Sequence, residues 1–526
     1  MVPKISTLGG YIFEYQKSIT NPTGFWSNIA ESFYWRKKWD EVLEWNFSEP
    51  TIKWFIGGKL NITENIFERN LFHRGDQPAI IWEPNDPDEE SRHITYNELY
   101  IRVKKFSNVL TSLGVRKGDR VAIYMPMIPE VAIAMLACAR IGAVHSVIFG
   151  GFSSQALSER IQDAGAKLLI TSDGGFRGSK TIPIKEIADE AMDHCQCVKT
   201  AVVVKRTGEK VPMKEGRDIW WHELEENASP EHKAVLMDSE DPLFILYTSG
   251  STGKAKGLVH TTGGYMVYTA YTFRNVFQYS DGDIYFCSAD VGWITGHSYL
   301  IYGPMLSGAT TLMFEGIPTW PDAGRYWEII DKHKVNQFYT APTAIRSLMA
   351  LGMEWLDGKH LRSLKVLGTV GEPINEDAWH WYHDHVGKNR CPIVDTWWQT
   401  ETGGIMISPL AGITPTKPSF ATMPLMGIHP VILDNDGKEL HGNSVEGNLC
   451  IRYPWPGIAR TIWGDHKRFK ETYFSSFPNH YFTGDGVKRD EDGYYRILGR
   501  VDDVINVSGH RLGTADRKST RLNSSH

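Results

Sequence analysis

The segment 247–257 holds the densest concentration of groups that could bind an anion. It reads Tyr-Thr-Ser-Gly-Ser-Thr-Gly-Lys-Ala-Lys-Gly, with three glycines, four Ser or Thr hydroxyls and two lysines, and it follows an apolar run at 243–246. Glycines let backbone N–H groups approach phosphate oxygens closely, hydroxyls add donors, and lysines add charge. The segment therefore predicts a phosphate-binding loop behind a buried strand. A mobile surface loop is the alternative, but it leaves the two lysines unexplained.

The spacing inside this loop argues against a Walker A box. Gly250 and Gly253 are too close together for one, and Lys254 is followed by Ala255 where a Ser or Thr is required. A P-loop NTPase is therefore disfavoured.

Further polar motifs follow in the C-terminal half of the chain. They are Gly-Glu-Pro at 371–373, Asp-Thr-Trp-Trp-Gln-Thr-Glu-Thr-Gly at 395–403, Tyr-Phe-Thr-Gly-Asp at 481–485 and Gly-Arg-Val-Asp-Asp at 499–503. In type and order these motifs resemble those of the acyl-adenylate-forming superfamily. The residue sequences of the segments 148–152, 292–299 and 506–514 resemble those of the acetyl-CoA synthetase family within that superfamily. Each motif alone has a structural explanation, such as a turn or a surface ion pair, but their number and order favour the functional one.

The resemblance implies a ligase that activates acetate with ATP, releases pyrophosphate, and passes the acetyl group from acetyl-AMP to the thiol of coenzyme A. Attack of a carboxylate on a phosphate needs charge neutralisation and alignment, so positioning and electrostatics would dominate. Two alternatives stay open. One is a propionyl-CoA or other short-chain acyl-CoA synthetase, and the other is a non-catalytic nucleotide-binding remnant.

The resemblance also assigns roles to residues. Asp485 would accept both ribose hydroxyls, Arg500 would reach the ribose or a phosphate, and Glu401 would hold Mg²⁺, since a hard cation prefers carboxylate oxygen. The implied catalytic residues are Thr248, Lys256, Glu401 and Arg511, the last at the α-phosphate. The implied ATP-binding residues are Ser249, Gly250, Ser251, Thr252, Gly253, Lys254, Gly371, Glu372, Pro373, Asp395, Thr396, Trp397, Trp398, Gln399, Thr400, Asp485, Arg500 and Arg511.

Aromatic bulk indicates a small acyl pocket. By resemblance Trp398 is its floor, and Trp293, Ile294, Thr295 and Val370 surround it. A rigid indole leaves room for little more than a methyl group, so acetate is the first choice and propionate the second. Tryptophans that simply fill core are the competing explanation, because the chain carries 18 Trp.

The segment 174–180, Gly-Gly-Phe-Arg-Gly-Ser-Lys, matches the family's CoA-binding segment. Its two cations in a glycine-rich stretch suit the ribose 3′-phosphate of CoA, although an isolated Arg-x-x-Lys pair is usually a solvated face. Thr319 stands where the family commonly has Asn. The implied CoA-binding residues are Arg177, Gly178, Ser179, Lys180, Thr295, Thr319, Ser508 and Gly509.

Alternating helices and short apolar strands predict an α/β fold of two doubly wound parallel-sheet subdomains plus a smaller β subdomain. The short strands beyond Pro418 form the β subdomain. The first sheet is expected from strands at 120–124, 143–149 and 167–172, with helices at 97–113, 129–142 and 156–164. The second sheet is expected from strands at 243–248, 310–314, 337–340 and 365–370.

The expected domains are an aromatic-rich N-terminal cap at 1–90, an AMP-dependent synthetase domain at 91–501, a hinge with the start of a truncated C-terminal domain at 502–515, and an artefactual tail at 516–526. By resemblance, Asp502 is the hinge of a mobile α+β domain that carries a Gly-Lys motif. No such segment follows Ala515, so we expect this chain to bind ATP and acetate weakly and to turn over poorly.

Charge and cysteine content argue against several classes. A net charge of −6 offers no basic field for nucleic acid or an acidic membrane. The six cysteines are scattered, which predicts neither a disulfide framework nor a zinc site and favours a reducing, cytoplasmic setting. The N-terminus lacks a secretory signal, and the apolar stretch 131–152 is broken by Arg140, Gly142 and His145. The expected partners remain the small molecules that the resemblance implies, acetate, ATP and CoA, and the sequence indicates no oligomeric state.

Overall fold

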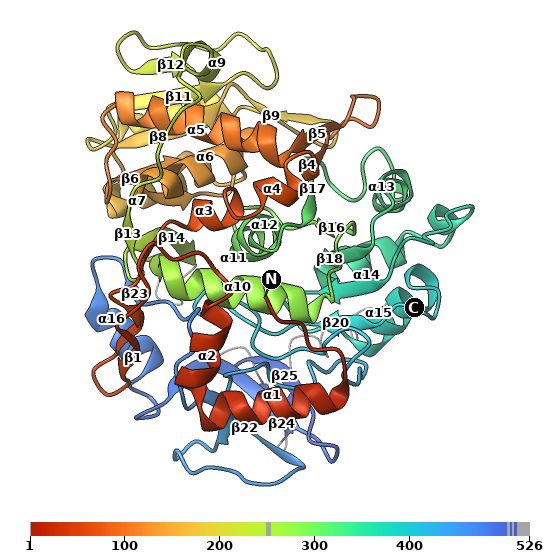
Figure 1. Cartoon of the computed structure of the whole chain (residues 1–526). Coiled ribbons are helices and arrows are strands. Elements are labelled where there is room, and N and C mark those ends of the chain that lie inside the picture. The colour runs from red at the N-terminus through yellow and green to blue at the C-terminus, as the bar shows by residue number, and fades with distance from the viewer. Residues whose placement is uncertain (1, 249–253, 502–504, 508–509, 513–526) are drawn as a thin grey trace.

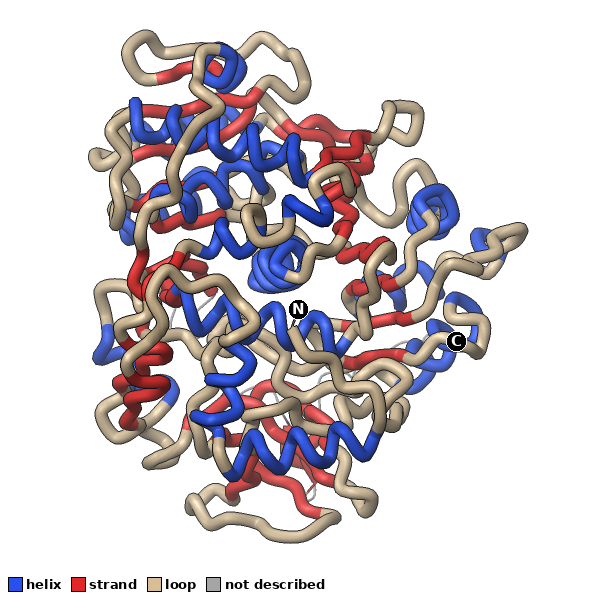
Figure 2. Tube along the Cα trace, viewed as in Figure 1, coloured by secondary structure: helices blue, strands red, loops and turns tan. Residues whose placement is uncertain are grey.

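The computed structural model describes residues 2–248, 254–501, 505–507 and 510–512. Its elements build two large sheets and a smaller antiparallel sheet, with helix α10 (Thr262–Val276) crossing the middle of the molecule (Figure 1). Helices and strands alternate along most of the chain, and Figure 2 shows where the two kinds of element lie. The predicted α/β class is therefore confirmed.

The first large sheet has eight strands. In spatial order they are β12 (Asp218–Trp220), β11 (Thr200–Val204), β8 (Leu168–Ser172), β6 (Arg120–Ile123), β7 (Val144–Val147), β14 (Pro242–Thr248), β15 (Lys256–Thr261) and β23 (Thr461–Ile462). Pairing is parallel from β12 to β14, and β15 and β23 add antiparallel. Its helices are α5 (Tyr96–Ser112), α6 (Pro129–Ile141), α7 (Ser154–Ala164), α8 (Ile184–Asp193) and α9 (Trp221–Glu226).

Helices cover both faces of this sheet because its central strands are apolar on both sides. Val121 and Ile123 pack in the core that contains α5 and α6, whereas Ala122 packs with α7 and α8. Helix α6 begins at Pro129, is followed by the C-cap residue Gly142 with φ +75°, and is buried along its whole length. Its burial explains the long apolar stretch in the sequence. Within the described residues, no helix has both the length and the apolarity needed to cross a membrane.

The second large sheet has seven strands, all parallel except its last. In order they are β20 (Ile393–Asp395), β19 (Val366–Thr369), β18 (Gln337–Thr340), β16 (Ile284–Cys287), β17 (Thr310–Phe314), β4 (Pro78–Glu83) and β5 (Arg92–Thr95). One face packs on α13 (Arg325–His333), α14 (Pro342–Ala350) and α15 (Glu376–Trp381), and the other faces the core that contains α10 and α12 (Gly303–Leu306). Short helical stretches complete this part: α11 (Ile294–Gly296), η1 (His297–Tyr302), η2 (Glu354–Leu356) and η3 (Tyr382–Val386).

One predicted strand belongs to a different sheet from the expected one. The strand expected at 243–248 forms as β14, but it pairs with β7 of the first sheet, where Phe244 lies opposite His145. Its placement in the second sheet was therefore wrong. Strand β4 from the N-terminal region occupies a place in the second sheet instead. An apolar run indicates that a strand is buried on both faces but does not identify its neighbours.

The predicted β subdomain forms as a four-stranded antiparallel sheet, which lies at the bottom of Figure 1. Its strands are β21 (Pro430–Leu433), β22 (Val445–Ile451), β24 (Tyr481–Arg489) and β25 (Tyr495–Arg500), with α16 (His466–Tyr473) beside them. The remaining elements are α1 (Leu8–Thr20), α2 (Pro22–Ala30), α3 (Ile62–Ile66), α4 (Leu71–Arg74), β1 (Glu41–Asn46), β2 (Thr51–Ile56), β3 (Lys59–Leu60), β9 (Gly175–Arg177), β10 (Lys180–Ile182), β13 (Met237–Asp238), β26 (Ile505–Val507) and β27 (His510–Leu512).

The N-terminal residues pack on this body. Trp26 of α2 is fully buried, with its ring 5.5 Å from those of both Tyr268 and Tyr271 in α10. The Tyr11 hydroxyl of α1 donates to the Pro424 carbonyl at 2.7 Å. Aromatic residues near the N-terminus therefore fill the space between the chain start and the larger core.

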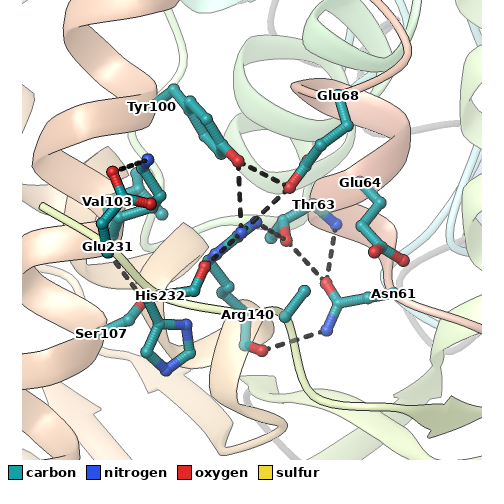
Figure 3. A network of polar contacts seen from close by, with 12 residues as sticks. Asn61, Thr63, Glu64, Glu68, Tyr100, Val103, Ser107, Arg140, Glu231 and His232 are labelled. Atoms are coloured by element: carbon teal, nitrogen blue, oxygen red, sulfur yellow. Dashed lines mark hydrogen bonds and ion pairs between the residues drawn. The ribbon is translucent and has the colours of Figure 1, made fainter.

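A buried arginine ties the N-terminal region to the first sheet. Arg140 of α6 is 1% exposed and donates to the Glu68 carboxylate at 3.0 Å and the His232 carbonyl at 2.8 Å (Figure 3). It also donates to the Thr63 hydroxyl at 3.2 Å, and its guanidinium lies 5.1 Å from the centre of the Tyr100 ring. The arginine that interrupts the apolar stretch is therefore held by partners from α3, α5 and two connecting segments, while its Nε is buried without a hydrogen-bond partner among the described residues.

Candidate active site

Two adjoining cavities open where the parallel strands of the second sheet end. Residues directly after β16, β18, β19 and β20 line them, which is the edge at which open α/β sheets bind ligands. The smaller cavity measures about 480 Å³ and the larger about 810 Å³. Both are lined by Gly371, Trp398, Gln399 and Thr400. A ligand could therefore extend from one cavity into the other.

The smaller cavity brings together four of the predicted motifs. Its lining includes Gly371, Glu372, Pro373, Asp395, Thr396, Trp397, Trp398, Gln399, Thr400, Glu401, Asp485 and Arg500. Residues near Gly371 and Asp395 come from the ends of β19 and β20, whereas Asp485 and Arg500 are opposite each other on β24 and β25. The second sheet and the β subdomain therefore both contribute residues to the lining of the smaller cavity.

Asp485 is the buried acceptor of this cavity, with only 6% exposure. Its Oδ2 accepts from Trp397 Nε1 at 3.1 Å and from Gln399 Nε2 at 2.7 Å. Arg500 Nη1 lies 3.9 Å from the other oxygen, Oδ1. Burial raises the pKa of Asp485 to about 6, although Arg500 and the two donors oppose the shift. Within the described residues Oδ1 accepts no hydrogen bond, so it can receive a donor from a ligand.

Asp395 is a second buried carboxylate at this wall. The Thr369 hydroxyl donates to its Oδ1 at 2.8 Å, and burial raises the pKa of Asp395 to about 7. The neighbouring Thr396 hydroxyl shares a hydrogen bond of 2.6 Å with Tyr339. These contacts hold the start of the 395–401 segment against β18 and β19.

The hairpin formed by β14 and β15 delivers the predicted phosphate-binding residues. Thr248 lies opposite Lys256 in the ladder, and its hydroxyl is buried without a hydrogen-bond partner among the described residues. Lys256 Nζ lies 3.9 Å from Glu401 Oε1, and the Tyr473 hydroxyl donates to the same oxygen at 2.5 Å. Burial lowers the pKa of Lys256, with Arg500 and Arg468 adding to the shift and Glu401 opposing it. An ammonium, a carboxylate and an unpaired hydroxyl therefore gather beside the smaller cavity.

The second predicted lysine, Lys254, pairs with a residue of α7, and several predicted site residues lie outside the described residues. Lys254 Nζ lies 3.1 Å from Asp163, and its side chain is 74% exposed. The described ranges do not include Ser249, Gly250, Ser251, Thr252, Gly253, Asp502, Ser508 and Gly509. For Arg511 the structure describes the backbone, which lies opposite Asn506 in the β26–β27 pair.

The larger cavity collects the residues expected around the acyl group and CoA. Its lining includes Arg177, Trp293, Ile294, Thr295, Thr319, Val370 and Trp398. The Trp398 indole is 8% exposed, donates to the Tyr339 hydroxyl at 3.1 Å, and meets the Tyr299 ring edge-on at 4.9 Å. Trp293 is 46% exposed and lies against Phe149 at 5.6 Å. Gly178, Ser179 and Lys180 follow Arg177 on the β9–β10 hairpin and do not line the cavity themselves.

Some lining groups were missed by the sequence analysis. Asp290 lines the larger cavity, accepts from the Gly292 N–H at 2.7 Å, and has its pKa raised by burial to about 6. It stands two residues before the recognised segment 292–299, which is a weak signal that was available. Tyr473 lies on α16, and nothing in its local sequence indicates contact with Glu401.

Comparisons with known proteins agree with this geometry. A family model described as "AMP-binding enzyme" matches residues 67–463, and one described as "Acetyl-coenzyme A synthetase N-terminus" matches residues 11–66. The chain is 58% identical over 510 residues to the acetyl-coenzyme A synthetase of Syntrophobacter fumaroxidans (strain DSM 10017 / MPOB), covering 97% of this chain and 78% of that protein. The chain belongs to the acetyl-coenzyme A synthetase family.

Other similar proteins support the same assignment. The acetyl-coenzyme A synthetase of Escherichia coli (strain K12) is 57% identical over 509 residues, which cover 96% of this chain and 78% of that protein. Among solved structures, an acetoacetyl-CoA synthetase from Streptomyces lividans superimposes with a TM-score of 0.89 at 25% identity, covering 97% of this chain and 77% of that one. The predicted resemblance to the acetyl-CoA synthetase family is therefore confirmed.

Proposed function

We propose that this chain acts as an AMP-forming acetate–CoA ligase. It activates acetate with ATP to give acetyl-AMP and pyrophosphate, and then transfers the acetyl group to coenzyme A. The observation that carries this proposal is that Trp398 lines both cavities. A nucleotide in the smaller cavity and a small acid in the larger one would meet at this indole.

The smaller cavity would hold the nucleotide. Adenine would lie beside 371–373, and Asp485 Oδ1 would accept from the ribose hydroxyls. Lys256 and the unpaired hydroxyl of Thr248 would face the phosphates, with 249–254 completing that contact. Two anions approach each other only when their charge is neutralised, so a buried ammonium on this side lowers the barrier to attack on the α-phosphorus. Arg500 and Arg511 would add positive charge toward the ribose and the α-phosphate.

Glu401 would hold Mg²⁺ with ATP. Magnesium in nucleotide sites usually takes one or two carboxylates plus phosphate oxygens, and Glu401 offers a carboxylate beside the groups proposed for the phosphates. The ion would supply further neutralisation of phosphate charge. Lys256 at 3.9 Å and the Tyr473 hydroxyl orient that carboxylate.

The larger cavity would hold the acyl group and the pantetheine arm of CoA. Trp398 would floor the acyl pocket, with Trp293, Ile294, Thr295 and Val370 around it, so acetate is preferred and propionate comes second. Arg177, Gly178, Ser179 and Lys180 would bind the phosphate end of CoA. Thr319, Ser508 and Gly509 would line its path.

We also retain the predicted organisation of the chain as a proposal. It has an N-terminal cap at 1–90, a synthetase domain at 91–501, and a segment at 502–515 in which Asp502 serves as a hinge. A cytoplasmic setting is proposed because all six cysteines are free thiols, as expected in a reducing compartment.

The experiment that tests this function is a titration with stable analogues of the acyl adenylate. Adenosine 5′-ethylphosphate and adenosine 5′-hexylphosphate carry a short and a long alkyl group in place of the acyl group. We expect the ethyl ester to bind at least about tenfold more tightly, because the indole excludes the longer chain. Equal affinity for both esters, or binding of neither, would overturn the proposal.

A further inference from the structure

The β9–β10 turn, which carries the proposed CoA-binding cations, is held by a side chain that follows a strand of the second large sheet. Asn85 lies just after β4, at the carboxyl edge of the second sheet, and is 4% exposed. Its Nδ2 donates to the Gly178 carbonyl at 2.9 Å, and the Gly178 N–H donates to Asn85 Oδ1 at 2.8 Å. One buried amide therefore satisfies both backbone groups of a single turn residue.

Gly178 is the residue at which the chain reverses between β9 and β10. Its φ is +60°, a left-handed conformation that favours glycine. A Cβ at this position would lie 3.0 Å from the Ile317 side chain, so the turn is also closely packed. Arg177 and Lys180 are opposite each other in the hairpin. A shift of Gly178 therefore changes the separation and direction of both cations.

The two cations are available to a ligand. Arg177 and Lys180 are both exposed, and no ion pair within the described part of the chain includes either of them. Arg177 also lines the larger cavity, where its guanidinium lies 6.0 Å from the centre of the Phe149 ring. Burial raises the pKa of Asp290 in the same cavity, and the charge of Arg177 opposes that shift. The positive charge of both exposed cations can bind a phosphate.

A separate bridge anchors the base of the same hairpin. Arg206, which follows β11, donates to both oxygens of Glu315 at 2.8 and 2.7 Å. Its guanidinium also lies 4.8 Å from the ring of Phe176 in β9. Because these contacts hold the base of the hairpin, loss of the Asn85 side chain should make the turn at 178–179 more mobile without unfolding the hairpin.

We propose that Asn85 is a positioning residue, which sets the turn at 177–180 so that Arg177 and Lys180 converge on the 3′-phosphate of CoA. This inference rests on the proposed CoA-binding role of that segment. Without the amide, Gly178 loses both of its hydrogen bonds, and the two cations no longer share one preferred geometry.

The test compares affinities of the full chain for CoA and for 3′-dephospho-CoA by calorimetric titration. The unaltered chain is expected to prefer CoA. In Asn85→Ala this preference should fall about tenfold, the size of one lost charge-assisted contact, while affinity for 3′-dephospho-CoA changes less than about twofold. A variant that was merely destabilised would lose affinity for both ligands equally.

Asn65 offers a matched control. It is fully buried, its Nδ2 donates to the Tyr34 carbonyl at 3.0 Å, and it accepts from the Tyr34 N–H at 2.7 Å, which is the same reciprocal pairing in another part of the molecule. Asn65→Ala should lower the thermal unfolding midpoint and leave the preference for CoA unchanged. A loss of preference in Asn65→Ala equal to that in Asn85→Ala would overturn the inference.

Arg177→Ala separates failure of the inference from failure of the function it rests on. If Arg177→Ala reduces the preference for CoA and Asn85→Ala does not, the positioning role of Asn85 is wrong. If the unaltered chain shows no preference, or if Arg177→Ala leaves it intact, the proposed CoA role of 177–180 fails and the inference fails with it.

Discussion

At the scale of single residues, Asp485 is buried and both of its hydrogen-bond donors bind one carboxylate oxygen. Asp485→Asn keeps the size of the side chain but removes the charge that would strengthen two ribose contacts. We expect the affinity for adenosine 5′-ethylphosphate to fall by about 2 kcal/mol, or roughly thirtyfold, in a calorimetric titration. The 2′,3′-dideoxy analogue is the control, because it should bind the unaltered chain and the variant about equally. If Asp485→Asn lost as much affinity for the dideoxy analogue as for the ethyl ester, the ribose hydroxyls would not be bound by Asp485.

The raised pKa of Asp485 predicts a pH dependence of the same affinity. Burial raises this pKa to about 6, so the carboxyl becomes protonated as the pH falls and can no longer accept from both ribose hydroxyls. The affinity for the ethyl ester, which does not itself titrate in this range, should fall about tenfold between about pH 7 and pH 5. The effect of pH on stability has the opposite sign. Because the pKa of Asp485 is higher in the folded than in the unfolded protein, its contribution to the free energy of unfolding is present at low pH and is lost as the pH rises through about 6.

Two variants check the assignment of this titration. Asp485→Asn should abolish the pH dependence of the affinity. Asp395→Asn should retain it, although burial also raises the pKa of Asp395, to about 7. If the pH dependence persisted in Asp485→Asn and disappeared in Asp395→Asn, the titrating carboxylate would be Asp395, and the assignment to Asp485 would be wrong.

Trp398 is the residue that should set the acyl length. Trp398→Gly removes an indole that is held by Tyr339 and Tyr299, and the space it leaves joins the larger cavity. We expect the preference for the ethyl over the hexyl ester to fall at least about tenfold. Trp398→Phe keeps a ring in place and should retain most of the preference. An unchanged preference in Trp398→Gly would show that another group excludes the longer chain.

The phosphate-binding loop was predictable because its glycines, hydroxyls and lysines stand directly after an apolar strand. Asp395, at the end of β20, and the tryptophan pair that follows it have a similar position, whereas Asp485 lies within β24 and was assigned only through the resemblance of the 481–485 motif. Tyr473 and Asn85 were not predictable, because each acts on a residue far away in the sequence. Their roles depend on how α16 and β4 are placed, and local sequence carries no record of that placement.

At the scale of elements, the hairpin of β14 and β15 carries Lys256 toward Glu401. Lys256→Met retains the apolar stem and removes the ammonium that would face the phosphates. We expect the affinity for ATP to fall about tenfold and that for adenosine 5′-ethylphosphate to change less than about twofold, since the ester lacks the β- and γ-phosphates.

Lys254 on the same hairpin is the matched comparison. Its ammonium is paired with Asp163 and the side chain is 74% exposed, so Lys254→Met should weaken ATP binding less than Lys256→Met does. An equal or larger loss in Lys254→Met would show that the outer lysine carries the phosphate contact.

The elements themselves could be predicted more fully than their pairing. The helix that begins at Pro129 and the strands β17, β18 and β19 lie close to their expected bounds, since capping residues and apolar runs define them locally. The sheet to which β14 belongs could not be predicted. Its partners β7 and β15 are selected by packing between Phe244 and the surrounding rings, including His145 and His260.

At the scale of the whole molecule, Arg140 links the N-terminal region to the body that forms the site. Arg140→Met should destabilise the protein by about 2–4 kcal/mol, because it removes a buried charge and leaves its hydrogen-bond acceptors unpaired. Urea unfolding measures this loss, and the affinity of the folded protein for adenosine 5′-ethylphosphate should stay the same. Lys38→Met is the control, since its exposed pair with Glu31 should contribute less than about 1 kcal/mol. Equal losses in the two variants would contradict a structural role for the buried network.

The central claim is that one bound molecule spans both cavities, and a crystal structure with adenosine 5′-ethylphosphate tests it most directly. We expect the ribose hydroxyls within hydrogen-bonding distance of Asp485, the phosphate between the ribose and Trp398, and the ethyl group against the Trp398 indole. Density for the analogue at any other place, or in the smaller cavity with its alkyl group directed away from Trp398, would contradict the account.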